Sequence, residues 1–322
     1  MKPLWDRWND LPDYILGITE EIWEGRGIAK LHDYFAEDVI FRMPSGLGVG
    51  NKAVIAATMA TLAEFPDRQL LGEDVIWSGT EDLGMLSSHR LFCTATHTGH
   101  GMFGAPTGKP VQFRAIAECH VKNGVIDDEW LTRDTGAVCR QLGRTAKDHA
   151  RRLIDMQGGP SRAKRPFTPD QDRPGPYQGQ GNDHVAGVRL AAILRSVMQT
   201  DLAVIRRDYD RACTLHQPGG VTGRSWTDAE EFWIGLRAAF PDATFRIDHQ
   251  IGLADDLMGP RGAVRWSLHG QHDGWGSFGP PTGAQVYIMG FTHADFGPRG
   301  LRTECTVFDE VAIWQQIHFH TG

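Results

Sequence analysis

The pattern of apolar and polar positions divides the first part of the chain into helices followed by strands. Apolar residues recur at helical intervals over 13–34, which predicts one long or two short amphipathic helices. A further helix is predicted over 52–64, and it must stop before Pro66 because proline cannot continue a helix. Over 90–97, apolar and polar residues alternate with a period of two, which predicts a half-buried strand.

Two more strands are predicted after a glycine- and proline-rich turn at 104–108. They cover 111–121 and 125–133, and Asn123-Gly124 between them is typical of a tight hairpin turn. Helices followed by an antiparallel meander predict an α+β domain, with helices on one face of a curved sheet.

The same pattern occurs twice in the chain. HTGHGMFGAPTGKPV begins at His97 and HDGWGSFGPPTGAQV begins at His272, and 272 minus 97 is 175. The same offset aligns the rest of 33–141 with the second half without a gap. Such a register predicts an internal duplication.

The duplication predicts a first domain over 1–150 and a second over 187–322. The segment between them, 151–186, contains five glycines and five prolines within 158–184, which favours a solvated interdomain linker.

Composition is that of an ordinary globular protein, and it excludes several classes of function. The chain has 322 residues, 41% of them apolar and 23% charged, with a net charge of -7. The acidic balance argues against nucleic acid as a partner. We find no signal peptide and no window of eighteen apolar residues, so we expect a cytoplasmic protein with no membrane partner.

Neither a disulfide framework nor a metal site is indicated. The five cysteines are odd in number and form no C-x-x-C pair. The fourteen histidines do not combine with carboxylates at a spacing specific for zinc or iron, and we therefore expect neither metal nor cofactor.

Three motifs in this order carry a family resemblance: FPD after the helix, H-x-G-x-x-x-F-G-x-P-T-G-K-x-V before the hairpin, and NGVIDDEWLTRDTGAVCRQLG at the end. They resemble the SnoaL-like polyketide cyclase family of the nuclear transport factor 2-like superfamily. The resemblance implies two tandem cone-shaped α+β barrels, each a curved antiparallel sheet wrapped around N-terminal helices and enclosing an apolar cavity. It also implies that the two copies form an intramolecular pseudo-dimer, with a homodimer of the chain as an open alternative.

The resemblance further implies candidate catalytic residues. In the family's cyclases a pocket aspartate acts as general acid/base in an aldol ring closure, without metal or organic cofactor. By motif position this aspartate is Asp134 and its accompanying histidine is His120. Asp134 can equally be the N-cap of a following helix, and His120 reaches the pocket only if the polar row of its strand faces inward.

Other candidate residues follow from the predicted strands and turns. His97 lies on an apolar strand face, where it can be catalytic or can hold the neighbouring turn by a hydrogen bond. Trp130, Arg114 and Phe103 are predicted to shape the pocket. The second-copy counterparts are Asp309, Asp295 and His272, and divergence such as Trp130 to Cys305 leaves open which copy is active.

The sequence thus predicts an enzyme that uses a pocket Asp/His pair for general acid/base chemistry on a small apolar carbonyl compound. Aldol cyclisation, isomerisation and dehydration are the reaction types considered. A non-catalytic small-molecule binding protein with two pockets, and a hydrolase on the same fold, remain as alternatives.

Overall fold

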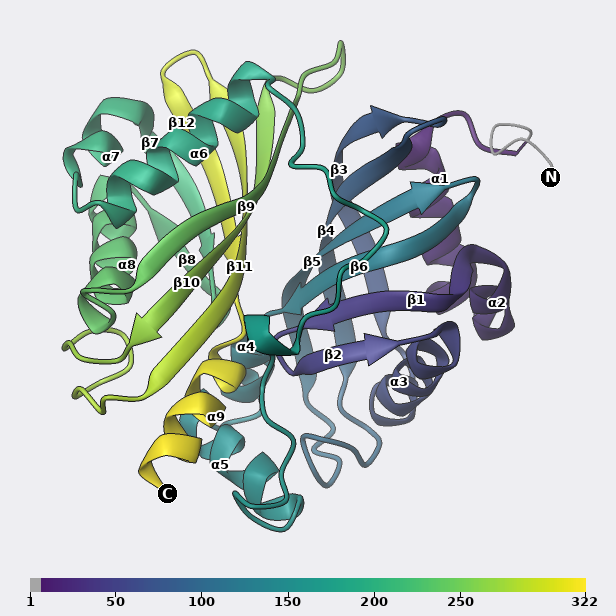
Figure 1. Cartoon of the computed structure of the whole chain (residues 1–322), viewed down its shortest axis with the longest axis horizontal. Helices are drawn as coiled ribbons and strands as arrows, with labels where there is room; N and C mark the ends of the chain where they lie inside the picture. Colours follow the sequence, from purple (N-terminus) through teal and green to yellow (C-terminus); the bar gives the residue numbers. More distant parts are fainter. Residues whose placement is uncertain (1–6) are drawn as a thin grey trace.

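The computed structural model describes residues 7–322, which form two six-stranded sheets, one in each copy of the repeat (Figure 1). The α+β class and the duplicated architecture predicted from the sequence are confirmed. Equivalent elements in the two copies begin close to 175 residues apart, as α3 at Asn51 and α8 at Trp226 illustrate.

The first copy has the following elements in chain order: α1 (Leu11–Thr19), a π-helical turn (Glu20–Glu24), a 3₁₀ turn (Ile28–Lys30), α2 (Leu31–Tyr34), β1 (Phe35–Met43), β2 (Gly46–Val49), α3 (Asn51–Glu64), β3 (Gln69–Thr80), β4 (Gly84–Thr96), β5 (Pro110–Lys122), β6 (Val125–Arg133), α4 (Thr135–Gln141) and α5 (Ala146–Met156).

After a 3₁₀ turn (Pro169–Gln171), the second copy repeats the pattern with α6 (Val185–Met198), α7 (Ala203–Asp208), β7 (Tyr209–Gln217), β8 (Val221–Arg224), α8 (Trp226–Ala239), β9 (Thr244–Leu253), β10 (Arg261–Gln271), β11 (Gln285–Gly297), β12 (Gly300–Val307) and α9 (Glu310–Thr321).

The two sheets share one topology. Their strand orders are β2-β1-β6-β5-β4-β3 and β8-β7-β12-β11-β10-β9. Neighbouring strands are antiparallel except that β1 runs parallel to β6 and β7 runs parallel to β12. We expected wholly antiparallel sheets, and this expectation was wrong. In each copy the last strand of the meander pairs in parallel with the first strand of that copy and is not an edge strand.

Local sequence signals explain the main boundaries. The predicted helix over 52–64 is α3, and the predicted hairpin turn joins β5 to β6. Asn123 and Gly124 have φ angles of 53° and 76°, the left-handed values that a type I′ turn requires. The predicted helical stretch over 13–34 is divided into α1, the π-helical turn, the 3₁₀ turn and α2.

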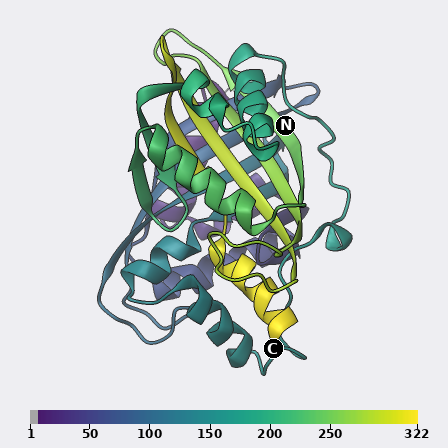
Figure 2. The same ribbon diagram turned by 90° about the vertical axis from the view of Figure 1, so that its left-hand side faces the viewer.

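The two sheets face each other, and the helices α1–α3 and α6–α8 cover their outer faces (Figure 1). Figure 2 shows α8 lying across the outer face of the second sheet. A set of apolar side chains from both sheets is buried between them: Ile76, Leu86, Ile116, Trp130, Ile251, Ala263, Met289, Phe291, Cys305 and Val307. The tandem copies therefore pair through their sheets, as the predicted intramolecular pseudo-dimer requires.

Buried charges accompany this apolar cluster. Arg265 Nε of β10 donates to Glu118 Oε2 of β5 over 2.7 Å, and both side chains are buried. Burial alone would raise the pKa of Glu118, but its interactions with His249 and Arg265 outweigh burial and hold the pKa at about 2. The Arg265 guanidinium also lies 4.1 Å from the centre of the Trp130 ring. Through Arg265, an ion pair thus joins β5 to β10 and a cation–π contact joins β6 to β10.

The segment between the copies is packed against both of them, whereas we expected a solvated linker. Phe167 N donates to Pro44 O over 2.9 Å in the first copy, and Asn182 N donates to Gln250 O over 3.0 Å in the second. The Tyr177 hydroxyl lies 2.7 Å from His249 Nε2. Helix α5 also extends past the predicted domain boundary at residue 150, to Met156, and α6 begins at Val185.

Asp134 connects the two copies at the end of β6. Its carboxylate accepts a hydrogen bond from Ala137 N (2.9 Å), which caps α4, and two more from Gly219 N (2.8 Å) and Gly220 N (2.9 Å) in the β7–β8 turn. Asp134 is therefore the N-cap of α4, as one of the two alternatives from the sequence proposed. The same carboxylate also accepts two hydrogen bonds from the second copy. Burial raises the pKa of Asp134 to about 6, although these three N–H donors favour the charged form.

Replacing Asp134 with alanine should destabilise the protein, because three buried N–H groups would lose their acceptor. We expect the free energy of unfolding to fall by about 1–3 kcal/mol. Urea unfolding followed by circular dichroism measures this change, with the exposed Asp33→Ala as matched control. Equal stability of the two variants would contradict the proposed connection.

The decrease in the free energy of unfolding caused by Asp134→Ala should also depend on pH. The folded pKa of about 6 lies above the unfolded value of about 3.9, so the folded state binds more protons between these values. Asp134 therefore contributes most to stability near pH 4, and this contribution decreases as the pH rises to about 6. The difference between wild type and Asp134→Ala should be larger at pH 4.5 than at pH 7, and a constant difference would argue against this titration.

Candidate active site

The first copy encloses a cavity between its sheet and the helices α1 and α3. The space not filled by atoms is about 930 Å³, including the open mouth. Its walls are mainly apolar, with side chains such as Ile18, Trp23, Phe41, Leu91 and Phe113. We call this space the inner chamber.

A second space of about 970 Å³ adjoins the first, and we call it the outer chamber. The two chambers share the residues Met43, Thr61, Arg68, Phe113, Leu131 and Arg133. The outer chamber also contacts Asp309, which comes from the second copy. The cavity of the first copy therefore reaches the junction between the copies.

The orientation of the two rows of side chains on β5 determines which of the predicted residues on this strand can line the cavity. Its apolar row lines the inner chamber through Phe113, Ala115, Ala117 and Cys119. Its polar row, which holds Arg114, Glu118 and His120, points toward the second copy, as the Glu118–Arg265 ion pair shows. The periodicity left this choice open, and the partner sheet decides it because it supplies counter-charges for the polar row.

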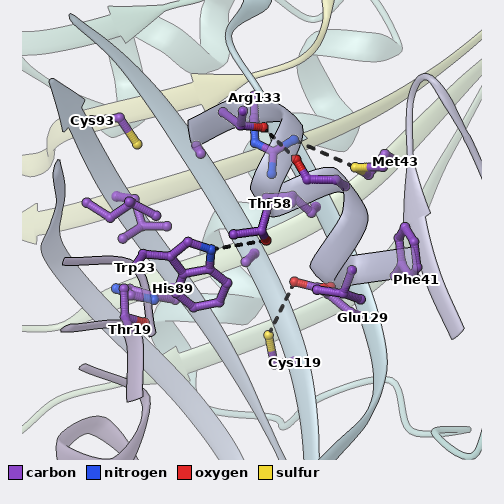
Figure 3. Close-up of a pocket in the computed structure, with 18 of the residues that line it drawn as sticks. Thr19, Trp23, Phe41, Met43, Thr58, His89, Cys93, Cys119, Glu129 and Arg133 are labelled. Atoms are coloured by element: carbon purple, nitrogen blue, oxygen red, sulfur yellow. Dashed lines mark hydrogen bonds between the residues drawn. The ribbon is translucent and has the colours of Figure 1, made fainter. Parts of the chain in front are cut away.

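Glu129 on β6 is the carboxyl group of the inner chamber. It is 9% exposed and belongs to the chamber wall, and the thiol of Cys119 lies 3.9 Å from its Oε1 (Figure 3). Burial raises the pKa of Glu129 to about 7, although the positive charge of Arg133 opposes the shift. A carboxyl group with this pKa can both take and give a proton near neutral pH.

His89 on β4 is a second titratable group in the wall of the inner chamber. Its side chain is 3% exposed, and its Nε2 has no hydrogen-bond partner among the described residues. Burial lowers the pKa of His89 to about 4, so the imidazole is neutral at pH 7. It can offer one hydrogen bond to a bound molecule without adding charge.

The helical side of the inner chamber contains a π-helical turn. This turn carries Trp23, whose indole N–H donates to Thr58 Oγ1 of α3 over 3.4 Å (Figure 3). Single π-helical turns occur often at functional sites. Here the turn places a large aromatic side chain in the cavity wall opposite the sheet.

Asp134 and Asp309, the predicted acid/base and its counterpart, both cap helices. Asp309 accepts from Val311 N (2.9 Å) and Ala312 N (3.4 Å), and the Thr135 hydroxyl donates to it (3.2 Å). Burial raises the pKa of Asp309 to about 7. Asp309 contacts the outer chamber, whereas the carboxylate of Asp134 points at backbone N–H groups. The catalytic role of Asp134 stays a prediction, and its placement favours the capping role.

His120 and Trp130 lie at the interface between the copies. We expected Trp130 in the cavity, and His120 there only if the polar row of its strand faced inward. His120 Nδ1 is 2.6 Å from Asp127 Oδ1, and its ring packs against Tyr177 of the connecting segment. Trp130 is buried beneath Arg42 and Arg265.

Arg114, also expected in the cavity, forms an ion pair with Glu73 at 2.7 Å on the same side of the sheet. Asp295, the counterpart of His120, lies on β11 opposite Arg261 of β10.

His97 holds a turn. Its Nδ1 is 3.1 Å from Thr107 Oγ1, within the glycine- and proline-rich turn, and its Nε2 is 3.3 Å from Glu64 Oε1. His272 repeats the first contact with Thr282 at 3.0 Å. The structural alternative considered for this histidine is thus present in both copies, and its catalytic role stays a prediction. Phe103 lines the outer chamber.

The interior of the second copy is filled where the first copy is hollow. Thr58 and Leu91 line the inner chamber, and their counterparts at an offset of 175 are Trp233 and Trp266. Both tryptophans are fully buried, and their ring centroids are 6.3 Å apart. A Cβ atom on Gly290 would lie 2.2 Å from the Trp266 ring, so this glycine is required to admit the ring.

The second copy nevertheless keeps the counterpart of Glu129. This residue, Glu304, accepts hydrogen bonds from the Tyr209 and Thr306 hydroxyls, and burial raises its pKa. Its carboxyl group is buried, with an exposure of 1% for the residue, and is enclosed by these hydrogen-bond partners. The first copy is therefore the better candidate for an active site.

Glu129, His89, Arg68 and Arg133 line the cavity but were not among the residues predicted from the sequence. The missing information was the facing of the strands, since Glu129 and Arg133 alternate with the Trp130 row that we placed in the pocket. Comparing the copies position by position could have found them. The carboxyl group is retained as Glu304, while Thr58 becomes Trp233, and this combination indicates one open and one filled interior.

Within the described residues, no group of three or more His, Cys, Asp and Glu is arranged to hold a metal ion. No helix in the described part of the chain has the length and apolar character needed to span a membrane.

Comparison with known proteins supports the resemblance read from the motifs. Residues 14–142 match the family model described as SnoaL-like polyketide cyclase. None of the curated proteins matches the chain.

Several solved structures are similar to one copy of the repeat. IdmH from Streptomyces antibioticus is 25% identical and covers 41% of this chain and 97% of its own, with a TM-score of 0.36. A SnoaL-like polyketide cyclase from Agrobacterium tumefaciens is 21% identical and covers 44% of this chain and 100% of its own, with a TM-score of 0.35. Over residues 14–142, which make up most of its first copy, the chain is similar to the SnoaL-like polyketide cyclase family.

Proposed function

We propose that the inner chamber of the first copy catalyses proton transfer at a carbon atom next to a carbonyl group in a small apolar compound. Glu129 is the general base and acid of this reaction. The observation that carries the proposal is a buried carboxyl group with a pKa of about 7 in a largely apolar chamber. The similarity of residues 14–142 to the SnoaL-like polyketide cyclase family supports the same class of chemistry.

In the proposed reaction, Glu129 both removes the proton and returns it. The Glu129 carboxylate takes a proton from the α-carbon, and the electrons of the broken C–H bond form an enolate. In an aldol cyclisation the enolate carbon then attacks a second carbonyl carbon, and the Glu129 carboxyl group returns its proton to the new alkoxide. In an isomerisation the proton returns to a different carbon of the same molecule.

The remaining groups of the chamber support this role. The apolar walls exclude water and raise the pKa of Glu129. His89 is neutral at pH 7, so it can form a hydrogen bond with the substrate without lowering the pKa of Glu129 through an added positive charge.

Glu129→Gln should abolish α-proton exchange. The probe is 2-tetralone in D₂O, an apolar cyclic ketone whose deuterium uptake is followed by NMR. The amide cannot accept the proton, so we expect the catalysed rate to fall by about 10²–10⁴-fold. Glu304→Gln, which changes the counterpart in the filled copy, should leave the rate unchanged. Wild-type exchange at the rate of buffer alone would contradict the proposal and favour a binding protein. Undiminished exchange in Glu129→Gln would also contradict it, and would assign the base to another residue.

The rate of exchange should rise with pH around the pKa of Glu129. The base must be ionised, so the rate is expected to increase through an inflection near pH 7 and then level off. NMR titration of a ¹³C-carboxyl-labelled sample measures the same pKa independently. An inflection near pH 4 would assign the base to an exposed carboxyl group instead.

Thr58→Trp should close the inner chamber by copying the residue of the second copy. We expect the mutant to lose 2-tetralone binding and exchange while remaining folded, because the second copy already accepts tryptophan at this position. Thr80→Trp, at an exposed site of β3, is the matched control. Isothermal titration calorimetry and circular dichroism separate the two effects, and unimpaired binding in Thr58→Trp would place the site elsewhere.

A further inference from the structure

Two arginines that form no ion pair with any described residue meet where the chambers join. Arg68 and Arg133 both line the inner and the outer chamber. Arg68 is 4% exposed, and its Nε has no hydrogen-bond partner. The Arg133 guanidinium donates a long hydrogen bond of 3.8 Å to Met43 Sδ (Figure 3).

Arg133 is partly buried and Arg68 is buried, whereas each of the other buried arginines in the described part of the chain lies near a carboxylate. Arg42 pairs with Asp128 at 2.5 Å, Arg261 with Asp74 at 3.0 Å, and Arg265 with Glu118 at 2.7 Å. Arg90 approaches Glu73 at 3.2 Å. Burying a cation without a partner is unfavourable. The positions of Arg68 and Arg133 therefore indicate that these two guanidiniums bind a ligand or act in the cavity.

Nearby carboxyl groups do not neutralise the two guanidiniums. Glu64 accepts from Phe103 N (2.7 Å) and Met102 N (3.1 Å), and Asp309 is occupied by helix capping. Glu129 shares the inner chamber, but it forms no ion pair with either arginine within the described residues, and burial keeps it partly protonated near pH 7.

The unpaired charges also affect the arginines themselves. Burial, together with the neighbouring charge of Arg133, lowers the pKa of Arg68 to about 10, and burial lowers the pKa of Arg133 as well. Both groups remain positively charged at neutral pH, and the junction of the chambers therefore has a positive potential.

The second copy shows that the fold does not need these charges. At an offset of 175, Arg68 corresponds to Ala243 and Arg133 to Phe308, and both replacements are buried in the core. The two arginines are thus found in the copy with the open cavity and are absent from the filled one. This contrast assigns them to the cavity rather than to folding.

We propose that Arg68 and Arg133 together bind a carboxylate group of the substrate, which is then an apolar carbonyl compound that also carries a carboxylic acid. The two guanidiniums come from different elements and can each donate to one carboxylate oxygen. The inference rests on the proposed function for the nature of the reacting group, but the anion site itself does not depend on it.

The spacing along β6 sets the length of this substrate. Glu129 and Arg133 are four residues apart on one face of the strand, which corresponds to about 13 Å between their Cα atoms. The acid group at Arg133 and the reacting carbon at Glu129 are therefore separated by several carbon atoms. An apolar ring system or chain between them fits the apolar walls of the inner chamber.

The test compares an apolar acid with a neutral molecule of the same shape. The probes are 2-naphthoate and 2-acetylnaphthalene, and their dissociation constants are measured by isothermal titration calorimetry. We expect the wild type to bind 2-naphthoate more tightly. The variant Arg68→Ala/Arg133→Phe carries the residues of the second copy and should bind 2-naphthoate at least about tenfold more weakly, a loss of about 1.4 kcal/mol. Its affinity for 2-acetylnaphthalene should change little.

Controls separate folding and catalysis from anion binding. Exposed Arg211→Ala should leave both affinities unchanged, and circular dichroism checks folding. If the double variant does not fold, Arg68→Ala alone provides the same comparison. Equal weakening for both probes, or no preference of the wild type for the acid, would overturn the carboxylate site.

Glu129→Gln distinguishes the two proposals. It should keep 2-naphthoate binding while losing 2-tetralone exchange, so a failure of exchange chemistry leaves the anion site standing. If the double variant loses only exchange and keeps its affinity for 2-naphthoate, the arginines stabilise an enolate instead, and the carboxylate proposal is overturned.

Discussion

The ion pair between Glu118 of β5 and Arg265 of β10 sets the orientation of the central strands. Successive side chains of a strand point to opposite faces, so placing Glu118 between the sheets places Ala117 and Cys119 inside the cone. Shifting β5 by one residue would exchange these rows and leave a buried carboxylate or guanidinium unpaired, at a cost of about 3–5 kcal/mol. The interface between the copies therefore determines which side chains line the cavity.

The same backbone supports two different interiors. In the second copy, Trp233 and Trp266 fill the cone, and its core is continuous from α6 to α9. In the first copy, small side chains leave space, and a carboxyl group, an imidazole and two guanidiniums are kept in the walls. Open space and unpaired buried charge both reduce stability. The sheet interface and the filled copy offset this loss, so the first copy need not be stable by its own packing alone.

The sequence allowed much of the fold to be predicted, because repeat, turn and helix signals are local. The offset of 175 residues, α3 and the Asn123-Gly124 turn all follow from nearby residues and agree with the structure. The site was harder to predict because it depends on which face of each strand lines the cavity. Alternation shows that β5 has a polar row and an apolar row, but only the partner sheet decides which one is buried against charges. We therefore placed Trp130 in the cavity, and His120 there only if the polar row faced inward, and did not select Glu129 on the neighbouring row.

The covalent connection of the copies has an evolutionary consequence. In a symmetric homodimer every substitution appears in both subunits, so a tryptophan that filled one cavity would fill the other as well. The packed segment over 157–184 joins the two halves in one polypeptide, and each half can then accumulate its own substitutions. The second half has a filled core and the first has a hollow, charged interior, a difference that two identical subunits could not show.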